Sequence, residues 1–118
     1  MPTKLNNALG AVYITDDVIS SLAGLCTVGC YGIVGMAAKR ATDGIVELLG
    51  LDNLSRGVKV NTNGDEAVID LFIIVEYGIS IAQVARNIID TVRYQVESQT
   101  GVKVPKVNVM VEGVRVQQ

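Results

Sequence analysis

The feature that most constrains the fold is the stretch from Val68 to Gly101, in which a strand runs into a long amphipathic helix. Five consecutive apolar residues, 71–75, predict a strand that is central in a sheet and covered on both faces. Ser80 and Gln83 form a capping box at the helix start, and Gly101 suits its C-cap. Apolar residues at helical spacing predict the face that packs on the sheet: Ile81, Val84, Ala85, Ile88, Ile89, Val92 and Val96.

A β-hairpin and a last strand flank this stretch. Residues 58–61 alternate between apolar and polar, and Asn-Gly-Asp at 63–65 provides a tight hairpin turn. The last strand, 106–116, changes its apolar phase at Gly113, which predicts a β-bulge or a kink there. Pro105 cannot donate a ladder hydrogen bond, so it suits a strand start or a sheet edge.

The amino-terminal part gives a less regular pattern. Residues 1–9 are expected to form a flexible arm, and residues 11–14 a short strand. Thr15 is an N-cap for a first helix that stops at Gly29. Met36–Leu49 is left open between a short helix and a separate turn, because a Thr-Asp-Gly sequence interrupts its apolar pattern.

These elements predict a single domain over residues 1–118, which is an ordinary length for one core. The predicted class is α+β, a small mixed β-sheet with a hairpin and with helices packed on one side, in the order β-α-(α)-β-β-α-β. Residues 18–38 contain no charge over 21 positions, which is long enough to cross a bilayer. Four glycines in this stretch favour a buried helix followed by a glycine-rich bend, so no membrane span is expected.

Composition argues against catalysis and metal binding. The chain contains no His, the side chain on which most proton transfer near neutral pH depends. Cys26 and Cys30 are its two cysteines, and nothing else completes a four-ligand metal site with them, so both are expected to be reduced and packed. The scattered carboxylates are not expected to converge: Asp65, Glu66, Asp70 and Glu76. We therefore expect no enzyme, no catalytic residue, no metal and no cofactor.

A small RNA-binding module is the alternative function that the motifs leave open. Gly29 to Gly32 and Gly32 to Gly35 each match the G-x-x-G loop of KH domains, and Lys39 and Arg40 lie a turn away. The loops themselves hold no basic residue, and the net charge of -2 lacks the basic footprint that nucleic acid requires. Nucleic acid is therefore not the expected partner.

Hydropathy favours contacts with other proteins. Apolar residues make up 49% of the chain and mean hydropathy is +0.38, so we expect a homo-oligomer. No signal peptide is visible, which predicts a cytoplasmic protein. The candidate partner or self-interface residues form a corner after the central strand and a charged row on the long helix: Glu76, Tyr77, Arg86, Asp90, Arg93 and Glu97. The alternatives are a simple bend at Gly78 and a solvated helix face.

Several segments resemble the alkaline shock protein family of Gram-positive bacteria. They are GVKV at 57–60, IDLFIIVEYGISI at 69–81 and TGVKVPKVNVMVEGV at 100–114, together with 10–18 and 32–36. The resemblance covers nearly the whole chain, and the Glu-Tyr-Gly turn at 76–78 is the one motif to carry over. Where many members have His, this chain has Met110.

The resemblance implies an α/β fold and a cytoplasmic protein linked to the cell-envelope stress response. For some members it also implies attachment to the membrane through a separate membrane-embedded partner. It implies no catalytic residue. We therefore expect a non-enzymatic scaffold that self-associates, docks on a membrane-anchored partner and contributes to the stress response through protein–protein interaction.

Overall fold

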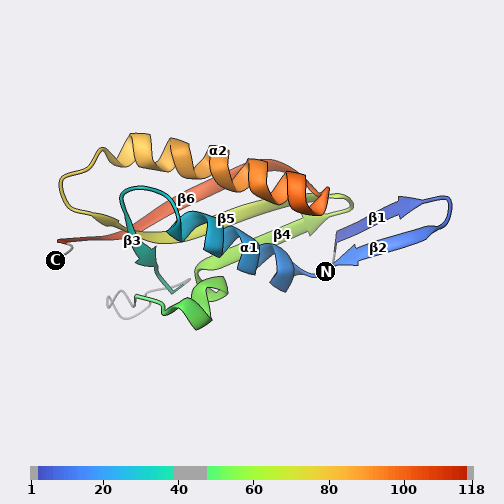
Figure 1. The fold of residues 1–118 in the computed structure, drawn as a ribbon, viewed down its shortest axis with the longest axis horizontal. Helices are drawn as coiled ribbons and strands as arrows, with labels where there is room; N and C mark the ends of the chain where they lie inside the picture. Colours follow the sequence, from blue (N-terminus) through green and yellow to red (C-terminus); the bar gives the residue numbers. More distant parts are fainter. Residues whose placement is uncertain (1–2, 39–47, 117–118) are drawn as a thin grey trace.

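The computed structural model describes residues 3–38 and 48–116 (Figure 1). It contains strands and helices in one chain and confirms the α+β class. In chain order the elements are β1 (Thr3–Asn7), β2 (Gly10–Ile14), α1 (Asp16–Val28), β3 (Ile33–Met36), the 3-10 helix η1 (Leu51–Gly57), β4 (Val58–Asn63), β5 (Glu66–Glu76), α2 (Ile81–Thr100) and β6 (Lys103–Arg115).

Strand β5 lies at the centre of the main sheet, as its apolar run predicts. β6 runs parallel along one edge of β5, from the pair Glu66 and Lys103 to the pair Glu76 and Arg115. The other edge of β5 is divided, because β4 pairs antiparallel with residues 66–71 and β3 with residues 73–75. Helix α2 is the crossover that brings the chain back parallel to β5.

Both long helices cover the same face of this sheet. α1 packs over β3 and β4, α2 packs over β6, and the two helices contact each other. The inward side chains of β5 are all buried: Ala67, Ile69, Leu71, Ile73 and Val75. The prediction that helices pack on one side is confirmed.

The opposite face of β5 is less well covered than its sequence predicts. Ile74 is buried there, but Phe72 is only half-buried, as are Val68 and Asp70. The prediction of two covered faces is therefore right for Ile74 and wrong for Phe72. An apolar run identifies a central strand, but no helix packs on its second face among the described residues.

Both long helices begin and end where the sequence predicts. The Thr15 Oγ1 accepts a hydrogen bond from the Val18 N–H at 3.4 Å, and Gly29 is the C-cap of α1. Ser80 Oγ accepts from the Gln83 N–H at 3.4 Å at the start of α2. Gly101 ends α2 in the left-handed conformation with φ of 77°. Side-chain oxygens at the N-termini satisfy amides that have no partner within the helix.

The last strand confirms the predicted bulge and begins earlier than predicted. Ile73 pairs with Val111 and Ile74 with Gly113, so Glu112 is an extra residue in β6. β6 starts at Lys103 rather than at 106, and this places Pro105 within the strand. β6 pairs with β5 alone in the described part of the chain, so a proline is tolerated on its other side.

The amino-terminal segment differs from the expected flexible arm. Thr3–Asn7 forms β1, which pairs antiparallel with β2 in a separate two-stranded sheet. The Lys4 Nζ lies 5.5 Å from the centre of the Tyr13 ring, on the residue directly opposite it. Figure 1 shows this hairpin projecting from the end of the molecule, whose longest dimension is 52 Å.

Strand β3 was not among the predicted elements, because its glycines were interpreted as a bend. Close packing explains the glycine at 35, because a Cβ on Gly35 would lie 2.6 Å from the Leu48 side chain. Ala37 forms a bridge with Leu48. Residues 39–47 lie outside the described ranges, so the choice between helix and turn for most of Met36–Leu49 is not tested.

Candidate interaction surface

The corner after β5 is fixed by backbone hydrogen bonds on two sides. The Glu76 N–H donates to the Gly32 carbonyl and the Tyr77 N–H donates to the Arg115 carbonyl, both at 2.9 Å. Gly78 follows with a φ of 91°, which confirms the predicted bend. The Tyr77 side chain is nevertheless 75% exposed. The backbone therefore holds an aromatic side chain in place without burying it.

Other exposed apolar side chains lie at this same end of the molecule. Tyr31 comes from the turn before β3 and is 79% exposed, Ile81 opens α2, and Val114 and Val116 lie at the end of β6. Figure 1 shows the α1–β3 turn, the β5–α2 turn and the end of β6 together at one end of the sheet. We call this set, with Tyr77, the Tyr31–Tyr77 patch.

A shallow hollow adjoins the patch at the N-terminus of α2. It measures about 200 Å³ and is lined by Tyr31, Ser80, Gln83, Val84 and Asn87. Its lining combines one aromatic ring with uncharged polar groups. Such a surface suits a protein contact, because apolar area lies beside groups that donate and accept hydrogen bonds.

Sequence reasoning identified Tyr77 but missed the other members of the patch. Ile81 was predicted to face the sheet as part of the apolar stripe, but it is 43% exposed because it lies in the first turn, beyond the buried residues Val84, Ile88, Val92 and Val96. Tyr31 lies in the turn between α1 and β3. Its position next to Gly32 was the one sequence signal of a surface turn.

The charged row on α2 does not join this corner. Arg86, Asp90 and Arg93 are exposed along the helix, whereas Glu97 is partly buried near its far end. A helix of 20 residues spans roughly 30 Å, so Glu97 and Tyr77 lie at opposite ends of α2. The six predicted interface residues therefore do not form one surface.

Glu97 contributes to the fold as well as to the charged row. Its Oε2 accepts a hydrogen bond from the Val104 N–H at 2.9 Å, and its Oε1 lies 4.0 Å from the Arg93 Nε. This carboxylate thus joins the end of α2 to the start of β6. A bond from a backbone amide to a charged acceptor is stronger than one to a neutral acceptor.

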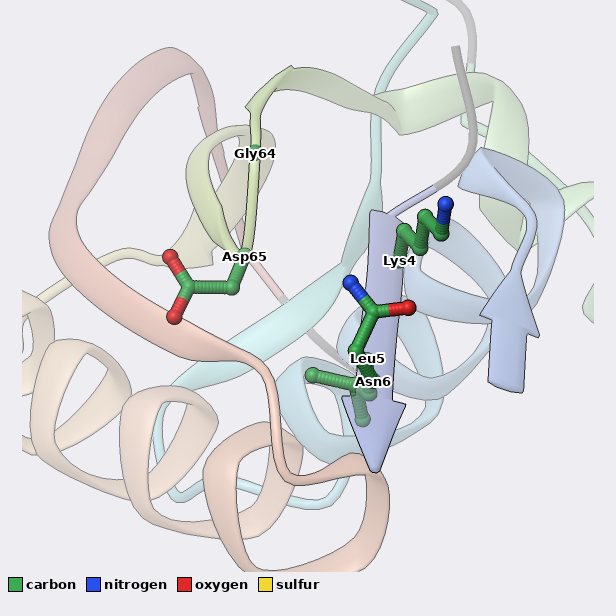
Figure 2. Close-up of a pocket in the computed structure, with 5 residues that line it drawn as sticks. All are labelled: Lys4, Leu5, Asn6, Gly64 and Asp65. Carbon is green, nitrogen blue, oxygen red and sulfur yellow. The ribbon is translucent and has the colours of Figure 1, made fainter. Parts of the chain in front are cut away.

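A second hollow lies between the amino-terminal hairpin and the turn from β4 to β5. It measures about 520 Å³ and is lined by Lys4, Leu5, Asn6, Gly64 and Asp65. Figure 2 shows the β1 side chains on one side and Asp65 on the other, with open space between them. Asp65 already forms an ion pair with Lys103, at 3.7 Å. The two charged residues that line the hollow, Lys4 and Asp65, thus already interact with Tyr13 and Lys103 of this chain.

Gly32, which the two G-x-x-G matches share, has a packing role. A Cβ on Gly32 would lie 2.8 Å from the Val84 side chain and 2.9 Å from that of Ile79, and Gly32 has a φ of 87°. Close packing and backbone conformation both require glycine at this position. Lys39 and Arg40, the basic residues of the RNA-binding alternative, lie outside the described residues.

The described ranges contain neither a bilayer-crossing helix nor a cluster of metal ligands. Neither α1 nor α2 combines the length and apolarity that a bilayer-crossing helix requires. Within residues 3–38 and 48–116, no three Cys, Asp or Glu side chains lie close enough together to hold a metal ion.

The two thiols predict a decrease in stability at alkaline pH. Burial raises the pKa of both Cys26 and Cys30; the neighbouring Cys30 raises that of Cys26 further, whereas a hydrogen bond with Thr91 opposes the rise at Cys30. As pH rises above the ordinary thiol pKa of about 8.5, the unfolded chain ionises first, so the free energy of unfolding falls. Urea denaturation at a series of pH values measures this slope. A Cys26→Ala/Cys30→Ala variant should show a flatter slope, and equal slopes would contradict the prediction.

Comparison with known proteins gives a consistent result. The model of the alkaline shock protein 23 family, described by a cell envelope-related function, matches residues 4–116. The uncharacterized protein YloU of Bacillus subtilis is 44% identical over 117 residues, which cover 98% of each chain. Spy1614 of Streptococcus pyogenes is 34% identical over 98% of this chain and 97% of its own, and YqhY of B. subtilis is 32% identical over 91% and 78%. No solved structure matches the chain significantly.

Proposed function

The chain belongs to the alkaline shock protein 23 family, whose function is cell envelope-related, and we propose that it acts as a non-enzymatic interaction protein. In this proposal it is a cytoplasmic scaffold that self-associates and docks on a membrane-anchored partner, and thereby contributes to the envelope stress response. The observation that carries the proposal is the Tyr31–Tyr77 patch, which holds exposed aromatic side chains on a fixed backbone.

Tyrosines at a fixed corner are suited to protein recognition. A tyrosine offers a large apolar ring and a hydroxyl, and ordering it on binding restricts only two side-chain torsions. Tyr77 is held by the hydrogen bond of its own amide to Arg115, and Tyr31 precedes Gly32, whose carbonyl accepts from Glu76. The backbone that carries both tyrosines is thus ordered before a partner binds, which lowers the conformational entropy lost on docking.

The composition of the patch favours a protein partner over a charged ligand. Its members are Tyr, Ile and Val, and the adjoining hollow is lined by Ser, Gln and Asn. Aromatic residues are enriched at the centres of protein interfaces, and uncharged polar groups are common at their rims. A membrane-anchored protein with a complementary apolar segment is therefore the expected occupant.

The test is recovery of the partner from detergent-solubilised membranes, with the intact chain as bait. We expect the double variant Tyr31→Ser/Tyr77→Ser to recover about tenfold less partner than the wild type, because two central aromatic contacts are lost. Tyr94→Ser is the matched control, since Tyr94 is 67% exposed on α2 and lies about 20 Å along the helix from Ile81.

Two outcomes would contradict the docking proposal. One is equal recovery by the double variant and by the Tyr94 control; the other is a wild-type chain that recovers no membrane protein. Circular dichroism and thermal unfolding of each variant show whether the fold is intact, because both tyrosines are largely exposed and their replacement should leave stability nearly unchanged.

A further inference from the structure

Strand β6 presents a long edge without a strand partner. It runs over 13 residues and pairs with β5, and among residues 3–38 and 48–116 no strand pairs with its other side. An open edge carries a row of amide and carbonyl groups that another strand can bind. Which groups point outward follows from the register with β5.

The outward groups of β6 belong to Val107, Val109 and Val111. The Phe72 carbonyl accepts from the Ala37 N–H, and the Glu76 N–H donates to the Gly32 carbonyl. The backbone groups of even-numbered residues of β5 therefore point towards β3. The backbone groups of odd-numbered residues point towards β6, as the hydrogen bond from the Tyr77 N–H to the Arg115 carbonyl shows. In a parallel pair such a residue bonds to the two neighbours of its partner, and the partner's own amide and carbonyl point away. The partners of Ile69, Leu71 and Ile73 are these three valines.

The rest of the edge is closed at both ends. At the start of the strand, Glu97 accepts the Val104 N–H at 2.9 Å, and Pro105 has no amide hydrogen. At the other end the bulge at Glu112 interrupts the regular ladder. Charges, prolines and bulges are the usual protection of an edge strand, and here they leave residues 107–111, Val-Asn-Val-Met-Val, unprotected.

We infer that this edge pairs antiparallel with the same edge of a second copy, with Val109 on the two-fold axis. This inference rests on the self-association in the proposed function and assigns its interface. In this register Val109 faces Val109 of the second copy and Val107 faces Val111, and each of these pairs exchanges two backbone hydrogen bonds. The two sheets become one continuous sheet, and Val111, which is 37% exposed, gains a neighbour on the helix side.

Charge complementarity selects both the second copy and the register. With Val109 on the axis, Lys106 of each copy lies opposite Glu112 of the other, so the dimer gains two cross-strand pairs of opposite charge. Centring the ladder on Asn108 places Lys106 opposite Met110 instead, and centring it on Met110 places Lys106 opposite Val114. Of these registers, the Val109 register alone places Lys106 opposite Glu112 and pairs outward backbone groups. Lys103 and Arg115 would also face each other in it, but they lie beyond Pro105 and beyond the bulge, outside the paired segment.

Charge reversal tests the inference on the full chain. Lys106→Glu or Glu112→Lys alone places like charges opposite each other twice per dimer, and we expect each to weaken dimerisation at least about tenfold in sedimentation equilibrium. The double variant restores opposite charges and should dimerise like the wild type. Lys59→Glu is the matched control, because Lys59 is an exposed lysine on β4, away from this edge. It should leave dimerisation unchanged.

Amide hydrogen exchange gives a second measurement that needs no variant. The amides of Val107, Val109 and Val111 should exchange more slowly as protein concentration rises, while those of Asn108 and Met110 stay protected throughout because they point to β5. Protection that does not depend on concentration would overturn the inference.

The outcomes separate the inference from the proposed function. If the wild type is monomeric at about 100 µM, self-association itself fails and the edge assignment fails with it. If the wild type dimerises but both single reversals behave like Lys59→Glu, only the edge assignment is overturned. If the reversals spare dimerisation and instead reduce recovery of the membrane partner, the edge receives a strand of that partner, and the inference is again overturned.

Discussion

Ile88→Ala lowers the free energy of unfolding by about 2–5 kcal/mol, because the loss of a buried isoleucine removes transfer free energy and leaves a cavity. Ile88 is fully buried in the stripe with which α2 packs on the sheet, and it belongs to the continuous core beneath both helices. α2 packs against both α1 and β6, so the side chains around Ile88 belong to separate elements and cannot collapse together into the space. Urea denaturation followed by circular dichroism measures the change.

The control is Ile81→Ala in the same helix. Ile81 is 43% exposed and lies one turn before the buried stripe, so its truncation should change stability by less than about 1 kcal/mol. Equal losses for the two variants would mean that Ile88 is not the deeper residue. Because Ile81 belongs to the Tyr31–Tyr77 patch, its variant should still reduce partner recovery, which separates an effect on docking from one on folding.

Gly32→Ala is the second large expected effect, at about 2–4 kcal/mol. Two terms contribute, since Gly32 has a φ of 87°, which disfavours any side chain, and an added Cβ would lie 2.8 Å from Val84 and 2.9 Å from Ile79. Val84 is itself a buried residue in the first turn of α2, so it has little room to move. Thermal unfolding together with urea denaturation measures the loss.

Gly78→Ala separates these two terms. Gly78 has a φ of 91°, almost the same as Gly32, but a Cβ there would meet nothing within 4 Å. We expect this variant to lose only the backbone term of about 1–2 kcal/mol. If Gly78→Ala destabilised the protein as much as Gly32→Ala, the contact with Val84 and Ile79 would contribute nothing.

The parts of the fold that the sequence predicts are those with local signals. The caps at Thr15, Ser80 and Gly101, the hairpin turn at Gly64 and the bulge near Gly113 all lie where single residues determine the backbone. The central position of β5 also follows from its own apolar run. In each case one short segment carries enough information to specify its structure.

The parts that sequence analysis missed depend on contacts distant in sequence. β3 contains Gly35 and directly follows Gly32, a spacing typical of a bend, and only the edge of β5 makes it a strand. β1 is stabilised by pairing with β2 rather than by its own composition, which is mostly polar. Tertiary partners overrode local propensity at both places.

The candidate surface was predicted only in part, because its members also come together through contacts that are distant in sequence. Tyr77 follows a recognisable strand end, but Tyr31 and Val114 join it only because β3 and β6 both lie beside β5. Arg86, Asp90 and Arg93 were correctly placed on the exposed side of α2. Glu97 is instead partly buried and binds the backbone of β6, a role that no spacing reveals. Whether these residues contact a partner stays a prediction.

The parallel pairing of β5 with β6 has a consequence for biosynthesis. β5 leaves the ribosome before the 20 residues of α2 and the strand that follows them have emerged from it. Until then the apolar face of β5 has no helix α2 above it, and one of its edges stays open to neighbouring nascent chains. We therefore expect newly made molecules to depend on chaperones until β6 has left the ribosome, and a message truncated within β6 to yield insoluble product.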